Sequence, residues 1–221
     1  MKVGIVIFPG SNCDKDAYRF MGELGFETEW LWHNNPSTNG VDLVFLPGGF
    51  SYGDYLRSGA IARFSPVMES VIDHALADKP VIGICNGFQI LVESGLLPGA
   101  LRRNQGGLFR CKTVALRKEE SCGGPWSGPP AGTILQIPIA HMDGNWYANE
   151  TQYESVQENN QVAYRYLENP NGSLGDVAGL LNTSGNVLGM MPHPERAGRA
   201  LLGSEDGREV FASILHTTAR T

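Results

Sequence analysis

Residues 80–89, which read PVIGICNGFQ, decide the fold of this chain. The short, β-branched apolar run before Cys85 is typical of a strand buried in a parallel sheet. The apolar residues after it follow helical spacing as far as Gly95, which can end the helix. Gly83 and Gly87 flank the turn without side chains, so the strand and the helix can approach closely. The stretch therefore predicts a strand, a sharp turn at Cys85 and a helix.

Cys85 is a candidate nucleophile because of this turn. A cysteine on a buried strand is most often a small core residue, and that alternative stands for Cys85 taken alone. Glycines on both sides of a strand-to-helix turn favour a nucleophile elbow instead. The N-terminus of the following helix would favour the thiolate, which is the reactive form of the side chain.

A histidine and a glutamate near the other end of the chain provide the partners that such a nucleophile needs. His193 lies between two prolines, which fix the backbone around it, and Glu195 follows. Taken singly, His193 could be a loop histidine and Glu195 a solvated charge paired with Arg196. Together with Cys85 they predict a Cys-His-Glu triad with nucleophile, base and orienting carboxylate, as in acyl-transfer enzymes.

Strand and helix patterns alternate in the first half of the chain. Asn12 or Asp14 is expected to cap a helix after the first strand, and a second amphipathic helix is predicted for residues 67–76. Alternation of this kind implies parallel pairing with right-handed crossovers. The predicted strands cover residues 2–8, 28–32 and 42–46.

The second half of the chain lacks this regular alternation of strands and helices. Residues 122–130 are rich in glycine and proline and predict an irregular surface loop. Antiparallel strands are predicted for residues 108–116, 133–139 and 161–167, and a hairpin for 177–181 and 187–191. We therefore expect one α/β domain over residues 1–221, with an open, largely parallel twisted sheet flanked by helices and an antiparallel strand extension.

Composition excludes several classes of function. The chain has 221 residues, of which 42% are hydrophobic and 18% charged, as in soluble globular proteins. Its net charge of -6 disfavours nucleic acid and anionic membranes as partners. The apolar run over residues 3–8 is too short for a signal peptide, and no stretch reaches the ~20 apolar residues of a membrane span. We expect a cytoplasmic protein.

The cysteines also favour a cytoplasmic protein. The four cysteines lack the CxxC spacing of structural zinc sites, so no metal is expected, and free thiols suit a reducing compartment. Cys13 is expected to be an ordinary loop thiol.

Two glycines follow the predicted strand over residues 42–46. Ligands of open α/β sheets gather at the carboxyl ends of strands, where Cys85 is also expected. The backbone N–H groups of Gly49 and Asn86 could form an oxyanion hole there. The alternative is a plain tight turn, and no Gly-Lys-Ser/Thr follows to make a phosphate loop.

These motifs resemble the class I, triad-type glutamine amidotransferases. Four segments narrow the resemblance to the glutaminases of phosphoribosylformylglycinamidine synthase, an enzyme of purine biosynthesis: PGSNCD at 9–14, GGFSYGDYLRSGA at 48–60, NPNGS at 169–173 and GMMPHPER at 189–196. The resemblance covers roughly residues 3–196. Residues 122–130, and Met142 with Asp143, depart from the pattern.

The resemblance implies a flavodoxin-like architecture and a mechanism. Cys85 would attack the side-chain amide of glutamine, with Gln89 and His141 as glutamine contacts. Ammonia would pass to a large ATP-dependent synthetase subunit, in a complex with a small accessory subunit. ATP and magnesium would be used by that partner, and this chain would bind no cofactor.

Two alternatives belong to other classes. A DJ-1-like cysteine hydrolase or stress protein shares the elbow but usually carries a histidine directly after the cysteine, where this chain has Asn86. A non-catalytic regulatory subunit would not need the intact Cys85, His193 and Glu195.

Overall fold

The structure, a computed structural model, describes residues 1–218. Residues 219–221 of the predicted domain lie outside this range. The helices are α1 (Asp14–Glu23), α2 (Val67–Leu76), α3 (Asn86–Glu93), α4 (Glu150–Glu158) and α5 (Ala212–Thr218). The strands are β1 (Lys2–Ile7), β2 (Glu27–Trp32), β3 (Leu43–Leu46), β4 (Val81–Ile84), β5 (Ala100–Arg102), β6 (Arg110–Lys118), β7 (Ile134–His141), β8 (Asn145–Tyr147), β9 (Val162–Tyr166), β10 (Val177–Leu181) and β11 (Val187–Met190).

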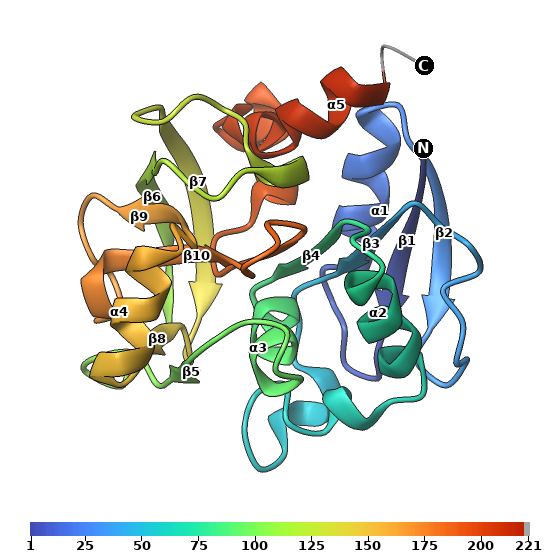
Figure 1. Cartoon of the computed structure of the whole chain (residues 1–221), viewed down its shortest axis with the longest axis horizontal. Coiled ribbons are helices and arrows are strands. Elements are labelled where there is room, and N and C mark those ends of the chain that lie inside the picture. The colour runs from blue at the N-terminus through green and yellow to red at the C-terminus, as the bar shows by residue number, and fades with distance from the viewer. Residues whose placement is uncertain (219–221) are drawn as a thin grey trace.

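A nine-stranded mixed sheet, in the order β2-β1-β3-β4-β11-β10-β9-β6-β7, runs through the molecule (Figure 1). The strands from β2 to β11 in this order pair in parallel, and those from β11 to β7 pair antiparallel. β3, β4, β10 and β11 are buried along their whole length, which explains their continuous apolar sequences. The predicted fold class, a largely parallel sheet with an antiparallel extension, is confirmed.

β11 joins the two halves of the sheet. The predicted hairpin of β10 and β11 is confirmed, with antiparallel pairing. The other edge of β11 pairs in parallel with β4, and Met190 lies opposite Ile84. The segment that follows β11 therefore leaves the sheet beside Cys85.

Helix α1 begins without the side-chain cap that was expected. Cys13 occupies the N-cap position, and no side chain accepts a hydrogen bond from the first turn. Asn12 cannot serve because its Oδ1 accepts from the Cys13 thiol (3.1 Å), and Asp14 is already the first helical residue. The helix is held instead by burial of its apolar face, with Ala17, Phe20 and Met21.

The sequence patterns missed helix α4 and the small β5–β8 sheet. Val156 is the buried residue of α4, so the helix has almost no apolar stripe to detect. Its signal is a capping box, in which Asn149 and Gln152 satisfy each other's backbone N–H groups.

The stretch over residues 122–130 is more than a surface loop, and that expectation was wrong in part. It contains a short turn, Gly124–Trp126, whose tryptophan is fully buried. Trp126 Nε1 donates to the Asn186 carbonyl oxygen (2.8 Å), and its ring meets Phe211 edge-on at 5.8 Å between centroids. A large aromatic side chain with a satisfied N–H anchors the segment to the core.

Across residues 1–218, none of the helices combines the length and the apolar character needed to cross a bilayer.

Candidate active site

Cys85 stands between strand β4 and helix α3 in the backbone conformation of a nucleophile elbow. Its φ of 52° and ψ of -105° are unusual for a residue with a side chain. Strain of this kind aims the side chain out of the turn, and it persists because the surroundings fix it. The Cys85 N–H donates to the Met190 carbonyl oxygen (2.8 Å), and a Cβ on Gly87 would lie 2.0 Å from the Leu46 carbonyl oxygen. The glycine is therefore what lets α3 start against the end of β3.

His193 and Glu195 form a buried pair on the turn after β11. His193 Nδ1 lies 2.6 Å from Glu195 Oε1, and the two residues are 1% and 4% exposed. The His193 N–H donates to the Pro138 carbonyl oxygen (2.8 Å), which fixes the segment against β7. His193 Nε2 is buried and has no hydrogen-bond partner in the described range. This nitrogen is free to exchange a proton with a bound substrate.

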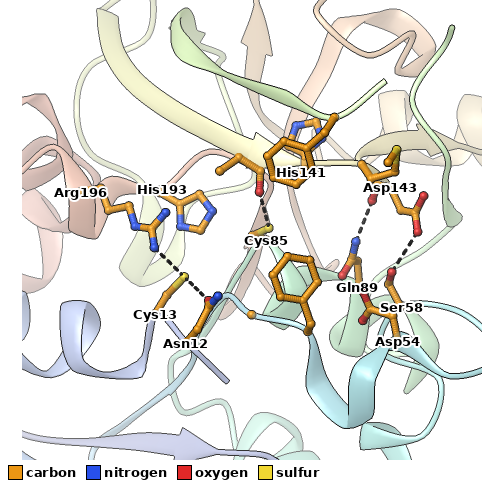
Figure 2. A pocket seen from close by; sticks show the side chains of 15 residues that line it. Asn12, Cys13, Asp54, Ser58, Cys85, Gln89, His141, Asp143, His193 and Arg196 are labelled. Carbon is orange, nitrogen blue, oxygen red and sulfur yellow. Dashed lines mark hydrogen bonds between the residues drawn. The ribbon is translucent and has the colours of Figure 1, made fainter. Parts of the chain in front are cut away.

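The structure brings Cys85 and His193 to the same cavity (Figure 2), beside Gly48, and Glu195 holds the His193 imidazole. A Cβ built on Gly48 would lie 2.7 Å from His193 Cε1 and 3.4 Å from Cys85 Cβ. The register between β4 and β11 explains this proximity, since Met190 lies opposite Ile84 and His193 follows three residues later. Any side chain at Gly48 would occupy the space that these two groups share.

The charges around His193 favour its protonated form. Burial lowers the pKa of His193, but the charge of Glu195 and the interactions with Cys85 and Cys13 outweigh burial and hold this pKa well above its usual value. An imidazolium held beside the nucleophile can donate a proton to a leaving group.

A cavity of about 220 Å³ opens over Cys85. Gly49 lines it, and Asn86 is the first residue of α3, where the backbone N–H has no intrahelical acceptor. Both members of the predicted oxyanion hole are thus next to the nucleophile. The Asn86 side chain accepts from the Ser51 N–H (3.1 Å) and so ties the loop after Gly49 to the helix.

The two predicted glutamine contacts also line this cavity. Gln89 is held on both sides, since its Oε1 accepts from Asn86 Nδ2 (2.9 Å) and its Nε2 donates to the Asp143 carbonyl oxygen (2.7 Å). His141 Nδ1 lies 3.0 Å from Asn104 Oδ1. Burial, helped by the charge of His193, lowers the pKa of His141 to about 4, so the imidazole is neutral at pH 7.

The expectation that Cys13 is an ordinary loop thiol was wrong. Cys13 is buried and lines the cavity, and Arg196 Nη2 donates to its Sγ (3.1 Å). No local sequence pattern could predict this contact, because the two residues are 183 positions apart. The position of Cys13 after β1 was a weak signal that it lies near Cys85, because the carboxyl ends of β1 and β4 are at the same edge of the sheet.

Cys13, His193 and Glu195 offer ligand atoms within 4.8 Å of one another, as a metal site would. His193 Nδ1 is already hydrogen-bonded to Glu195, and the Arg196 guanidinium donates a hydrogen bond to the Cys13 sulfur. A positive charge in contact with one ligand disfavours a cation, so the arrangement suits acyl transfer better than metal binding.

Comparison with known proteins agrees with this geometry. The family model of the CobB/CobQ-like glutamine amidotransferase domain matches residues 1–209. A solved chain of PurLQS from Thermotoga maritima is 44% identical, with 98% of each chain covered and a TM-score of 0.90.

Two more distant structures share the fold. One is a GMP synthase component from Thermoplasma acidophilum (16% identity, TM-score 0.68, 100% of this chain and 94% of that chain). The other is a glutamine amidotransferase from Thermotoga maritima (15% identity, TM-score 0.56, 99% and 85%). Because the family model spans nearly all of the sequence and the 44% identical chain is covered almost end to end, this chain belongs to the CobB/CobQ-like glutamine amidotransferases.

Proposed function

We propose that this chain is the glutaminase subunit of phosphoribosylformylglycinamidine synthase. It releases ammonia from glutamine for the synthetase subunit that converts formylglycinamide ribonucleotide to formylglycinamidine ribonucleotide in purine biosynthesis. The observation that carries this proposal is the 44% identity to a PurLQS chain over 98% of both chains. The segments over residues 9–14, 48–60, 169–173 and 189–196 support the same assignment.

The reaction follows from the positions of the side chains. The Cys85 thiolate attacks the amide carbon of glutamine, and the N–H groups of Gly49 and Asn86 stabilise the oxyanion. His193 gives its proton to the departing ammonia, which leaves a γ-glutamyl thioester on Cys85. The same imidazole then takes a proton from water, which attacks the thioester and releases glutamate and the free thiolate. Glu195 orients the imidazole and stabilises its charged form.

The ammonia is consumed by other polypeptides. In this proposal a large synthetase subunit binds ATP and magnesium, a small accessory subunit completes the complex, and the glutaminase carries no cofactor of its own. All three act in the cytoplasm. The loop after Gly49 is suited to contact the synthetase, since Tyr55 and Leu56 are 75% and 88% exposed while Arg57 anchors the loop to Glu93 through two hydrogen bonds of 2.6 Å.

A DJ-1-like hydrolase fits less well, because the base comes from His193 on a distant segment and the residue after Cys85 is Asn86.

Reconstitution tests the proposal. The chain is mixed with the large synthetase and small accessory subunits, formylglycinamide ribonucleotide and ATP, and product is measured with glutamine or with ammonium as nitrogen source. Cys85→Ala should abolish glutamine-dependent synthesis and leave ammonium-dependent synthesis intact. If native chain and synthetase produce no glutamine-dependent product while ammonium supports it, the proposal is wrong.

A further inference from the structure

Cys13 brings its sulfur to the His193 imidazole from a separate segment of the chain, the start of helix α1 (Figure 2). Cys13 Sγ, a ring nitrogen of His193 and a carboxylate oxygen of Glu195 all lie within 4.8 Å of one another. A Cβ built on Gly48 would meet both Cys13 Sγ (3.0 Å) and His193 Cε1 (2.7 Å), so the sulfur and the ring border the same small space. The reaction described above gives this buried thiol no role.

The Cys13 sulfur is fixed by its own hydrogen bonds. Arg196 Nη2 donates to it at 3.1 Å, and the thiol donates to Asn12 Oδ1 (3.1 Å). The Cys13 N–H donates to the Gly48 carbonyl oxygen (3.2 Å), and the residue is 3% exposed. Arg196 is held in turn by Asp16, whose Oδ2 accepts from its Nε (3.1 Å). A sulfur fixed in this way can support a side chain that packs against it.

The His193 imidazole needs such support. Its Nδ1 is hydrogen-bonded to Glu195 Oε1 (2.6 Å), while its Nε2 has no hydrogen-bond partner among residues 1–218. The direction in which Nε2 points therefore depends also on the atoms packed around the ring. A catalytic group has to be held within about 0.5 Å of its productive position, and packing against Cys13 limits the movement of the ring.

The same sulfur lies between two cations. Arg196 is positively charged, and the surroundings of His193 favour the imidazolium, so the two groups repel each other. Burial lowers the pKa of the Arg196 guanidinium, and the interaction with Cys13 is the largest of those that raise it. Cys13 also helps to hold the pKa of His193 above its usual value, against the effect of burial. One sulfur thus stabilises the charged forms of both neighbours.

The other titratable groups around His193 come from different elements and have other roles. Cys85, from the turn between β4 and α3, is the nucleophile, and Glu195 orients the ring through Nδ1. His141, at the end of β7, stays neutral at pH 7 and adds no charge there. Cys13 is therefore the group through which the start of helix α1 acts on the imidazole.

We propose that Cys13 is a positioning residue of the triad, whose sulfur holds the His193 imidazole in its reactive orientation and separates it from the Arg196 guanidinium. The inference rests on the proposed glutaminase function and deepens it. In this role Cys13 forms no bond to the substrate and acts through His193. Alanine at position 13 would remove the support of the ring and the acceptor for Arg196. Serine would keep an acceptor at nearly the same place.

Two measurements test the inference. The first follows the protonation of His193 in the isolated chain, by NMR titration of protein labelled with ¹⁵N-histidine, with the His193 signals identified by their loss in His193→Ala. The second measures kcat and KM for glutamine in the reconstituted complex, together with ammonium-dependent synthesis. Both are made on the native chain, Cys13→Ala and Cys13→Ser. Cys111→Ala is the matched control, because it removes an exposed thiol.

Cys13→Ala should lower the pKa of His193 and reduce kcat for glutamine roughly 10- to 100-fold, with KM changed less than about threefold, because the displaced group acts in the chemical step. Cys13→Ser should recover most of both quantities. Cys111→Ala should behave as the native chain, and ammonium-dependent synthesis should be unchanged in every variant.

A native pKa of His193 in Cys13→Ala overturns the inference even if turnover falls, since the loss would then come from the fold alone. Native kcat in Cys13→Ala, or a serine variant no better than alanine in either measurement, overturns it as well. If the native complex makes product from ammonium and none from glutamine, the proposed function fails, and the titration of His193 still decides whether Cys13 acts on the imidazole.

Discussion

Gly48→Ala should damage catalysis with little change in the rest of the fold. The Cβ would lie 2.7 Å from His193 Cε1 and 3.0 Å from Cys13 Sγ. Carbon atoms in contact are usually about 3.5–4.0 Å apart, so the imidazole would have to move by about 0.8 Å. His193 is held by Glu195 and by the Pro138 carbonyl oxygen, so the adjustment must be made within the triad.

The expected loss can be estimated from this displacement. Misplacing a reacting group by about 1 Å can cost about 10²-fold in rate, and overpacking costs about 1–3 kcal/mol of stability. Glutamine-dependent synthesis by the reconstituted complex should therefore fall about 100-fold. Ammonium-dependent synthesis should stay at the native level, because it does not use the triad.

The control is Gly22→Ala in helix α1. A Cβ at Gly22 meets no atom within 4 Å, and alanine favours a helix by up to about 1 kcal/mol over glycine. This variant should be fully active and at least as stable as the native chain by thermal denaturation. If Gly48→Ala keeps glutamine-dependent synthesis within threefold of native, the steric reasoning about the triad is refuted.

Three further predictions concern the triad, pH and docking. His193→Ala should approach the defect of Cys85→Ala, and Glu195→Gln should cost up to about 10⁴-fold in glutamine-dependent turnover; near-normal rates in both variants would contradict the triad. The neutral His141, with a folded pKa of about 4 against about 6.5 unfolded, contributes stability that is complete above pH 6.5 and is lost as pH falls toward 4. The free energy of unfolding, measured with urea, should therefore fall less steeply between pH 7 and 5 in His141→Gln than in the native chain. One titrating group can contribute at most about 1.4 kcal/mol per pH unit to this slope. Tyr55→Ala should weaken binding to the synthetase by about tenfold in titration calorimetry, without affecting Cys85 alkylation by iodoacetamide; unchanged affinity would exclude Tyr55 as an anchor.

The elements closest to the chemistry were predictable because their signals are local. The strand, turn and helix around Cys85 follow from apolar spacing and two glycines, and the structure reproduces them with β4 and α3. Helix α4 was missed because it buries little, and its signal is the Asn149 capping box rather than an apolar period. The burial of Trp126 was also missed, because the glycine and proline residues around it are typical of an exposed loop.

The sequence by itself determined the fold class, the elbow at Cys85 and the identity of its partners His193 and Glu195. Turn chemistry and side-chain type are properties of short segments, so they can be read without coordinates. Only the tertiary structure decided that β11 lies between β4 and β10, which places His193 beside Cys85. It alone revealed the Cys13–Arg196 contact beside His193. Such pairs depend on strand order and register over long sequence separations, and no local pattern encodes them.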